Sequence, residues 1–416
     1  MNFSDWLTLL KDGSDHAART LYRSLHRAPS SAICWIPKEE ELRKFFEAAA
    51  VSNGPLRGIP FGIKDLFDLP GSPTTASSQF LPSLRKSKNQ PSNIIQRFID
   101  SGAIPAAKTT LNEFAYGLSG QNAHFGDCPH PTFPNLLSGG SSSGSAWVVG
   151  SGLLPIAIGT DTGGSIRVPS AYCGLYGLRL QPGEFIDSAT FPLSPSFDTV
   201  GWMTRNADDM ATAIQALISE TSISPPKSPP GIYIGTGQCS VEIQTACTNT
   251  AQSIGFVLEA DAQRNFEATC HDASRAFSII QSYEAFQVHR SWIDSHKDQY
   301  DPKVWPLIDR GRRWSDKDLE WAQQKRVSVT NFLHKLLAEF GAIALPATHT
   351  GAPRSEQLTA TFRSNLLDLT TPASLAGLPV LTVPILLKEG LSAGMQIMLR
   401  NPKDAHTILE RVPGLL

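Results

Sequence analysis

A serine that directly follows two glycines lies in the run Gly159-Thr160-Asp161-Thr162-Gly163-Gly164-Ser165-Ile166-Arg167-Val168-Pro169-Ser170. Because glycine carries no side chain, successive backbone N–H groups can converge on one point there. We expect the N–H groups of Thr162, Gly163, Gly164 and Ser165 to form such a nest. Amides arranged in this way can hold the oxyanion that develops when a hydroxyl attacks a carbonyl. The run therefore favours acyl transfer at Ser165 over a simple turn.

Two segments upstream carry residue types that the same chemistry needs. One is Gly139-Gly140-Ser141-Ser142-Ser143-Gly144-Ser145-Ala146, and the other, Gly58-Ile59-Pro60-Phe61-Gly62-Ile63-Lys64-Asp65, ends an apolar run on a lysine. Ser141 and Ser165 each follow a double glycine and lie 24 positions apart (165 − 141). The three segments together resemble the amidase signature family, whose members use a Ser-cisSer-Lys triad.

The resemblance implies a role for each of these residues. Ser165 would be the nucleophile, Ser141 the serine preceded by a cis peptide bond, and Lys64 the base. Asp161 and Arg167 flank the nest and would orient it by hydrogen bonds, although a purely structural ion pair explains them equally well. The resemblance also implies an α/β amidase signature fold, with a mixed central β-sheet covered by α-helices on both sides, and neither a metal nor an organic cofactor.

A lysine can take a proton only when it is neutral, so its pKa must fall below the ordinary value of about 10.4. Burial lowers the pKa of an amine because it disfavours the charged form. Phe61, Ile63, Leu66 and Phe67 supply an apolar neighbourhood for Lys64. We expect Ser141 to pass the proton between Ser165 and this amine.

Apolar periodicity predicts alternating helices and strands in the first half of the chain, which indicates an α/β sheet. Lys64 and the nucleophile run would then both follow strand ends. The predicted helices are 39–50, 92–101 and 143–150, and the predicted strands lie within 56–63, 103–108, 153–158 and 174–180.

In the second half, the proline-rich stretch 225–230 predicts a linker. A strand at 231–235 and one long helix over 266–292 are expected to follow. Residues 344–347 resemble the strand and turn before a pocket loop of the family, and residues 370–384 with 394–396 resemble its closing strands. We predict one domain over residues 1–416, with a signature core at about 55–205 and 341–416 and a variable, substrate-shaping region at about 205–340.

Composition excludes several classes of partner. The formal net charge of −2 leaves no basic footprint for nucleic acid. No apolar run reaches about 18 residues, so we expect no membrane span and a cytoplasmic protein. The six cysteines are scattered without CxxC spacing, which predicts free thiols. A homodimer remains open.

The same residues allow other interpretations. Residues 140–144 match the G-x-S-x-G elbow of α/β hydrolases, which would make Ser142 the nucleophile, with Asp198 and His349 in the right order. That interpretation leaves Lys64 and Ser165 without a purpose. Residues 83–86 match S-x-x-K but lie in a polar stretch, and neither glycine-rich run ends in the Gly-Lys-Ser/Thr of a phosphate loop.

By family analogy, residues 112–126 run along the acyl pocket, with the Ala115 carbonyl and Ser141 facing the substrate. The motifs look most like small plant-type amidases acting on indole-3-acetamide, which implies a small primary amide with an aryl or apolar acyl group. Leu180, Glu184 and Ala189 depart from the family pattern beside the expected pocket. The alternative is the glutamine-hydrolysing A-type subunit of a tRNA-dependent amidotransferase, which would need a partner protein and is generally longer.

Overall fold

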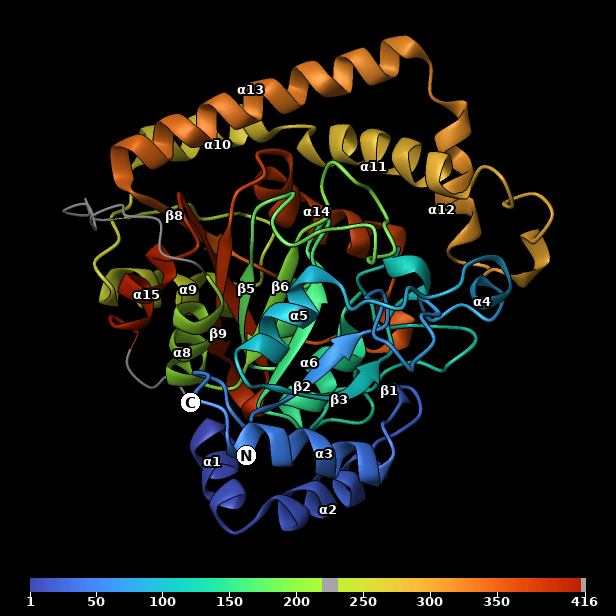
Figure 1. The fold of residues 1–416 in the computed structure, drawn as a ribbon. Helices are drawn as coiled ribbons and strands as arrows, with labels where there is room; N and C mark the ends of the chain where they lie inside the picture. Colours follow the sequence, from blue (N-terminus) through green and yellow to red (C-terminus); the bar gives the residue numbers. More distant parts are fainter. Residues whose placement is uncertain (219–230, 413–416) are drawn as a thin grey trace.

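A single mixed β-sheet runs through the protein in the computed structural model, which describes residues 1–218 and 231–412 (Figure 1). Ten strands in these residues follow the order β1-β3-β2-β4-β6-β5-β9-β10-β8-β7. Their bounds are β1 Ile33–Trp35, β2 Pro60–Lys64, β3 Ile104–Thr109, β4 Ile156–Thr160, β5 Tyr176–Arg179, β6 Val200–Thr204, β7 Ile232–Tyr233, β8 Ala342–Pro346, β9 Val380–Leu386 and β10 Ser392–Leu399.

The strands that position the site are parallel and fully buried. β2 pairs in parallel with β3 and with β4, and every residue of the three strands is buried. Parallel neighbours end at the same edge of a sheet, so Lys64 at the end of β2 and Thr160 at the end of β4 come together. Ligand and catalytic sites commonly lie at this edge in open α/β sheets.

The remaining pairs make the sheet mixed. β4 pairs antiparallel with β6, and the β6, β5, β9, β10 and β8 strands continue antiparallel, before β7 closes the edge in parallel with β8. The predicted mixed sheet is therefore confirmed.

Helices flank the sheet. α6 packs against β2 and β4, and α7 packs against β9 and β10. In Figure 1 α1, α2 and α3 lie together at the bottom, and α10, α11 and α13 lie across the top. The bounds are α1 Phe3–Lys11, α2 Ser14–Leu25, α3 Glu39–Ala50, α4 Leu81–Leu84, α5 Asn93–Asp100, α6 Ser143–Gly150, α7 Arg167–Tyr172, α8 Ala207–Leu217, α9 Val241–Ser253, α10 Ala260–Cys270, α11 Ala273–His289, α12 Trp305–Asp309, α13 Asp316–Phe340, α14 Ala360–Leu375 and α15 Asp404–Leu409. Short 3₁₀ turns, η1 Glu113–Ala115, η2 Lys297–Gln299, η3 Arg310–Arg313, η4 Ser355–Gln357 and η5 Lys388–Gly390, complete the set.

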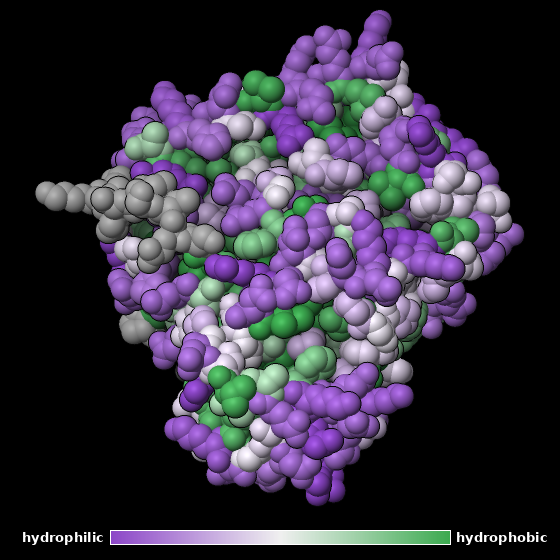
Figure 2. Space-filling view, viewed as in Figure 1, coloured by the Kyte–Doolittle hydropathy of each residue, from purple (hydrophilic) through white to green (hydrophobic). Residues whose placement is uncertain are grey.

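Apolar side chains are gathered in the interior. On the face shown in Figure 2, hydrophobic residues appear in small groups among hydrophilic ones. One core joins the N-terminal helices to the sheet, and a second lies between α11, α13, α14 and the strands. No helix in the described ranges is long and apolar enough to cross a membrane. All six cysteines are unpaired, as predicted.

Most predicted elements of the first half are confirmed to within a few residues, and α3 and α6 have the predicted bounds. Two predictions in the second half were wrong. The expected helix over 266–292 is interrupted, because α10 ends at Cys270 and Asp272 adopts a left-handed conformation with φ 61° before α11 begins. Aspartate tolerates that conformation better than most residues, so it ends one helix and starts another.

The first part of the expected closing strand at 370–384 is helical. α14 continues to Leu375 despite Pro372, and β9 begins only at Val380. The expectation rested on the family resemblance, and the apolar run itself could not correct it, because short apolar runs do not distinguish a buried helix from a buried strand. The predicted linker at 225–230 lies outside the described residues.

Candidate active site

Lys64 is the last residue of β2, and its amine contacts the hydroxyls of Ser141 and Thr160. Its side chain is 0% exposed, and Nζ lies 2.7 Å from Ser141 Oγ and 2.8 Å from Thr160 Oγ1. The peptide bond between Gly140 and Ser141 is cis, as the sequence resemblance implied. A side chain at Gly140 would collide with Asn112 Oδ1, which explains why glycine precedes the serine.

Burial lowers the pKa of Lys64 to about 7, and the carboxylates of Asp161 and Asp198 oppose that shift. An amine with this pKa is partly neutral at neutral pH, which a base requires. At the observed distance, neutral Nζ can accept a proton from Ser141 Oγ while donating to Thr160.

Ser165 follows β4 in the glycine-rich turn, and its residue is 3% exposed. The Ser142 N–H donates to the Ser165 carbonyl at 3.3 Å, which joins the two serine segments. Within residues 1–218 and 231–412 the Ser165 hydroxyl makes no hydrogen bond. Catalytic hydrogen bonds are often open without substrate, so the Ser141–Ser165 link is expected to close when an acyl group is bound.

The predicted nest is partly corrected by the structure. The Gly164 N–H donates to Asp161 Oδ1 at 2.9 Å. Because this bond anchors the turn, the Gly164 N–H is not available to an oxyanion, contrary to the prediction. The N–H groups of Thr162, Gly163 and Ser165 donate to no group in the described part of the chain. These three remain available for an oxyanion.

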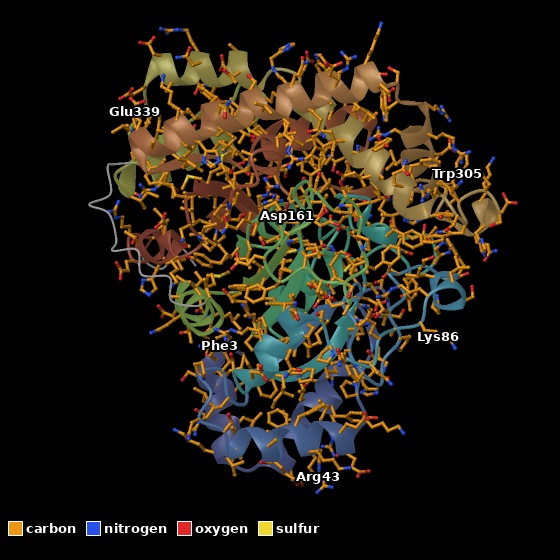
Figure 3. The ribbon with its side chains drawn as sticks, turned by 45° about the horizontal axis from the view of Figure 1, so that its top comes forward. Phe3, Arg43, Lys86, Asp161, Trp305 and Glu339 are labelled. Carbon is orange, nitrogen blue, oxygen red and sulfur yellow. The ribbon has the colours of Figure 1, made fainter. Side chains whose placement is uncertain are left out.

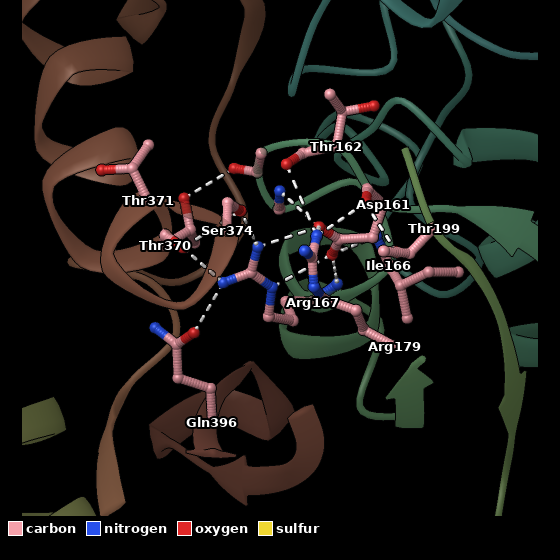
Figure 4. A network of polar contacts seen from close by, with 12 residues as sticks. Asp161, Thr162, Ile166, Arg167, Arg179, Thr199, Thr370, Thr371, Ser374 and Gln396 are labelled. Atoms are coloured by element: carbon pink, nitrogen blue, oxygen red, sulfur yellow. Dashed lines mark hydrogen bonds and ion pairs between the residues drawn. The ribbon is translucent and has the colours of Figure 1, made fainter. Parts of the chain in front are cut away.

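Asp161 anchors the turn from inside the protein, near the middle of the molecule in Figure 3. Its carboxylate accepts N–H bonds from Gly164, Ile166 and Arg167 and pairs with the Arg167 and Arg179 guanidinium groups, each at 2.8 Å (Figure 4). Burial alone would raise the pKa of this carboxyl, but the two guanidinium groups hold it well below its ordinary value.

Arg167 also ties this network to α14 and β10. It donates to the Thr370 carbonyl at 2.6 Å, to Ser374 Oγ at 2.9 Å and to Gln396 Oε1 at 2.9 Å. Thr370 Oγ1 in turn donates to the Gly163 carbonyl at 2.6 Å. Asp161 and Arg167 therefore position the turn from behind, as predicted, and do so as a buried ion pair.

Replacing Asp161 with asparagine should lower the free energy of unfolding by about 3 to 5 kcal/mol, because two buried guanidinium groups lose their counter-charge. Urea denaturation measures this. The matched control is Asp15→Asn, which breaks the exposed pair with Arg19 and should cost no more than about 1 kcal/mol. Equal losses in both variants would contradict the anchoring role of Asp161.

Sequence reasoning gave Thr160 and Arg179 no role, and it considered Asp198 only as the acid of the alternative triad. Thr160 contacts Lys64, Arg179 supplies the second guanidinium on Asp161, and Asp198 accepts a hydrogen bond from Thr162 Oγ1 at 2.6 Å. Thr160 was detectable, because it stands at a predicted strand end beside the nest. Arg179 and Asp198 come from strands and loops whose pairing with the turn no local pattern reveals.

Ala115, whose carbonyl is predicted to face the substrate, lies at the end of the 3₁₀ turn η1. It adopts φ 61° next to Phe114 at φ 53°, a left-handed pair that is rare for residues with side chains. Ala115 and Thr160 line one cavity of about 440 Å³, together with Leu66, Phe191 and Asp198. The Ala115 carbonyl accepts an N–H bond from Gly117 at 3.1 Å and retains a second lone pair.

The structure does not assemble the alternative triad. Ser142 Oγ donates to the Thr160 carbonyl at 3.2 Å, Asp198 is bound by Thr162, Leu193 and Ser194, and His349 packs on Phe362. No hydrogen bond or ion pair joins Ser142, Asp198 and His349 in the described residues. Ser83, which lies in α4 and not in the expected loop, and Lys86 are both exposed.

One family model and several known proteins are similar to this chain. The sequence model of the family described as Amidase matches residues 24–408. Amidase 1 of Arabidopsis thaliana is 27% identical over 86% of this chain and 93% of its own length. Indoleacetamide hydrolase of Pseudomonas savastanoi is 34% identical over 58% of this chain and 54% of its own length.

Two further similarities bear on the fold and the alternatives. The A-type subunit of the glutamyl-tRNA(Gln) amidotransferase of Chloroflexus aurantiacus is 28% identical over 94% of this chain and 88% of its own length. A crystal structure described as an amidase superposes with a TM-score of 0.83 and 26% identity, covering 99% of this chain and 98% of the other.

Proposed function

Because this chain belongs to the amidase signature family and is an amide-hydrolysing enzyme, we propose that it cleaves the C–N bond of a small primary amide with an aryl or apolar acyl group. The observation that carries the catalytic assignment is the contact of buried Lys64 with Ser141. The next residue, Ser142, donates its N–H to the Ser165 carbonyl and so links this segment to the nucleophile turn. The products would be a carboxylate and ammonia.

In the proposed reaction Ser165 Oγ attacks the amide carbonyl carbon. Its proton passes to Ser141, which gives its own proton to neutral Lys64. The oxyanion accepts N–H bonds from Thr162, Gly163 and Ser165, the donors that remain free. When the intermediate collapses, the C–N bond breaks and the proton returns from Lys64 through Ser141 to the leaving nitrogen.

Ammonia then leaves a seryl acyl-enzyme. A water molecule attacks the ester by the reverse relay, Lys64 again receives the proton through Ser141, and collapse releases the carboxylate and the Ser165 hydroxyl. Every proton taken by Lys64 is returned within the cycle. The residues of this chain supply each group that the two steps need.

The proposed preference for an aryl or apolar acyl group rests on the lining of the cavity beside Thr160 and on the similarity to one relative. The cavity beside Thr160 is bounded by Leu66, Ile186, Phe191, Leu193 and Val288, which favour an apolar group. The similarity to a protein named indoleacetamide hydrolase supports an aryl acetamide. Segment 205–340 supplies Val288 and Trp292 to this wall, in line with the proposed substrate-shaping role of that region.

A second candidate is the glutamine-hydrolysing component of an amidotransferase. It is favoured by the similarity to such a component over 94% of this chain. That function would require a docked partner and preference for glutamine. The first candidate predicts activity of the isolated protein.

Ammonia release from a panel of indole-3-acetamide, phenylacetamide, short aliphatic amides, malonamate, biuret and glutamine separates these candidates. We expect release from the aryl amides and its loss in Ser165→Ala. Release from glutamine alone would transfer the assignment to the second candidate. A cytoplasmic location is an accompanying prediction, to be checked by fractionation. Light scattering would decide whether the protein forms a homodimer, which the sequence leaves open.

A further inference from the structure

A second cavity, which we call the Arg363 cavity, lies between the loop after β3 and α14. Its volume is about 450 Å³. Its polar wall includes Asn112, Tyr116, Gln121, Lys303 and Arg363. The apolar part of its wall is formed by Leu118, Val304, Leu307, Leu358, Phe362 and Leu366.

Both walls of this cavity continue to the nucleophile turn. On one side, Asn112 packs against Gly140, and the Leu118 carbonyl accepts the Gly140 N–H at 2.9 Å. On the other side, Arg363 and Leu366 share a face of α14 with Thr370, which holds Gly163. Ser165 itself does not line the Arg363 cavity. The two walls are therefore what connects this cavity to the N–H nest.

Arg363 has no ionic or hydrogen-bond partner for its side chain in the described residues. Its Nε atom is buried and unpartnered, and the ring centroid of Tyr116 lies 6.0 Å from its guanidinium carbon. A cation at that distance from a ring is at the limit of a useful cation–π contact. A largely buried guanidinium without a carboxylate is unfavourable, because its lost hydration is not replaced.

A second guanidinium, that of Arg310, adds to the positive charge that no carboxylate balances. Arg310 donates to Tyr116 Oη at 3.3 Å, and its Nε is also buried and unpartnered. Burial lowers the pKa of Arg363, and the positive charge of Arg310 lowers it further. The acid of the cavity, Asp301, accepts backbone N–H bonds from Ala123 and Lys303. No carboxylate in the described residues pairs with either arginine.

We propose that Arg363, with Arg310 beside it, binds a carboxylate on the acyl part of the substrate, so that the amide hydrolysed is the monoamide of a dicarboxylic acid. The planar guanidinium fork matches a carboxylate in two parallel hydrogen bonds. This inference rests on the proposed amidase function and revises its substrate class: the acyl group ends in a carboxylate and extends into the Arg363 cavity, not into the cavity beside Thr160. The apolar wall between the arginine and the nest would hold the methylenes or the ring that joins the two groups.

The placement of Arg363 also sets a minimum length for the substrate. Arg363 precedes Thr370 by seven residues on α14, which is about 10 Å along a helix. Short monoamides such as succinamate should therefore bind less well than glutaramate, adipamate or 4-carbamoylbenzoate. Glutamine carries an ammonium group in addition, and the described residues of the cavity offer it no uncommitted acid.

Calorimetric titration of the Ser165→Ala variant tests this inference without turnover. Adipamate and 4-carbamoylbenzoate should bind at least about 10-fold more tightly than hexanamide and benzamide, their neutral counterparts, the gain expected of a charge-assisted hydrogen-bonded pair. Adding Arg363→Gln should remove that preference, and Arg363→Lys should restore part of it. Arg354→Gln removes an exposed arginine at the start of η4 and should leave the preference as it is.

Two outcomes would overturn the inference. One is equal affinity for charged and neutral amides in Ser165→Ala. The other is an equal loss of affinity for both in Arg363→Gln, accompanied by a lower melting temperature, which would make Arg363 structural. Failure of the wild-type protein to hydrolyse any amide would instead count against the proposed function, and the titration would still decide the role of Arg363.

Discussion

Ser165→Ala should lower kcat/KM for every amide that the enzyme hydrolyses by roughly 10⁴- to 10⁶-fold, the range seen when a catalytic nucleophile is removed. Ser165 directly follows the turn in which the N–H groups of Thr162 and Gly163 donate to no described residue. Ammonia release under single-substrate conditions measures the effect. Far-UV circular dichroism and the melting temperature should match the wild type, because the Ser165 hydroxyl makes no hydrogen bond in the described residues.

Ser142→Ala is the matched control for that variant. Ser142 lies next to Ser141 and is fully buried, but its hydroxyl donates to the Thr160 carbonyl and does not face the nest. Its removal should cost no more than about tenfold in kcat/KM, the effect of one lost neutral hydrogen bond. If Ser142→Ala were inactive and Ser165→Ala active, the nucleophile would be the elbow serine and the proposed triad would be wrong.

Much of the site was predictable because its chemistry is concentrated in three short runs. Ser165, Ser141 and Lys64 each stand beside glycines or at the end of an apolar strand, and these are local signals. The parallel pairing of β2 with β4 then brings Lys64 to the nest. The cis bond before Ser141 was predicted from the family resemblance, and residue spacing alone would not have revealed it.

What the sequence did not reveal depends on long-range packing. The Gly164 N–H was expected to face an oxyanion, but the Asp161 carboxylate takes it, because that carboxylate is aimed inward by Arg179 from a different strand. Arg363 lies 198 positions after Ser165 (363 − 165) in a helix whose end, from Thr370 to Leu375, was predicted as strand. A pattern of residues cannot show that a guanidinium lacks a partner, since that depends on every element around it.

Lys64→Met should lower kcat/KM by roughly 10² to 10⁴-fold, the usual contribution of a general base. Methionine keeps an apolar side chain of similar length and removes the amine. In the wild type, kcat/KM should rise with pH and level off above a midpoint near 7, because only the neutral amine accepts a proton and burial lowers the pKa of Lys64 to about 7. Below that midpoint it should fall about tenfold per pH unit.

Asp198→Asn provides a directional control for that midpoint. The Asp198 carboxylate favours the charged form of Lys64, so removing its charge should lower the pKa of the amine and move the midpoint to lower pH. A purely structural Asp198 would change the rate without moving the midpoint. A flat wild-type profile between about pH 5.5 and 8.5 would mean that Lys64 is not the titrating base, whatever the loss in Lys64→Met. A lower midpoint in Asp198→Asn and the loss of kcat/KM in Lys64→Met would together show that the neutral amine, and not only the lysine side chain, is required for hydrolysis.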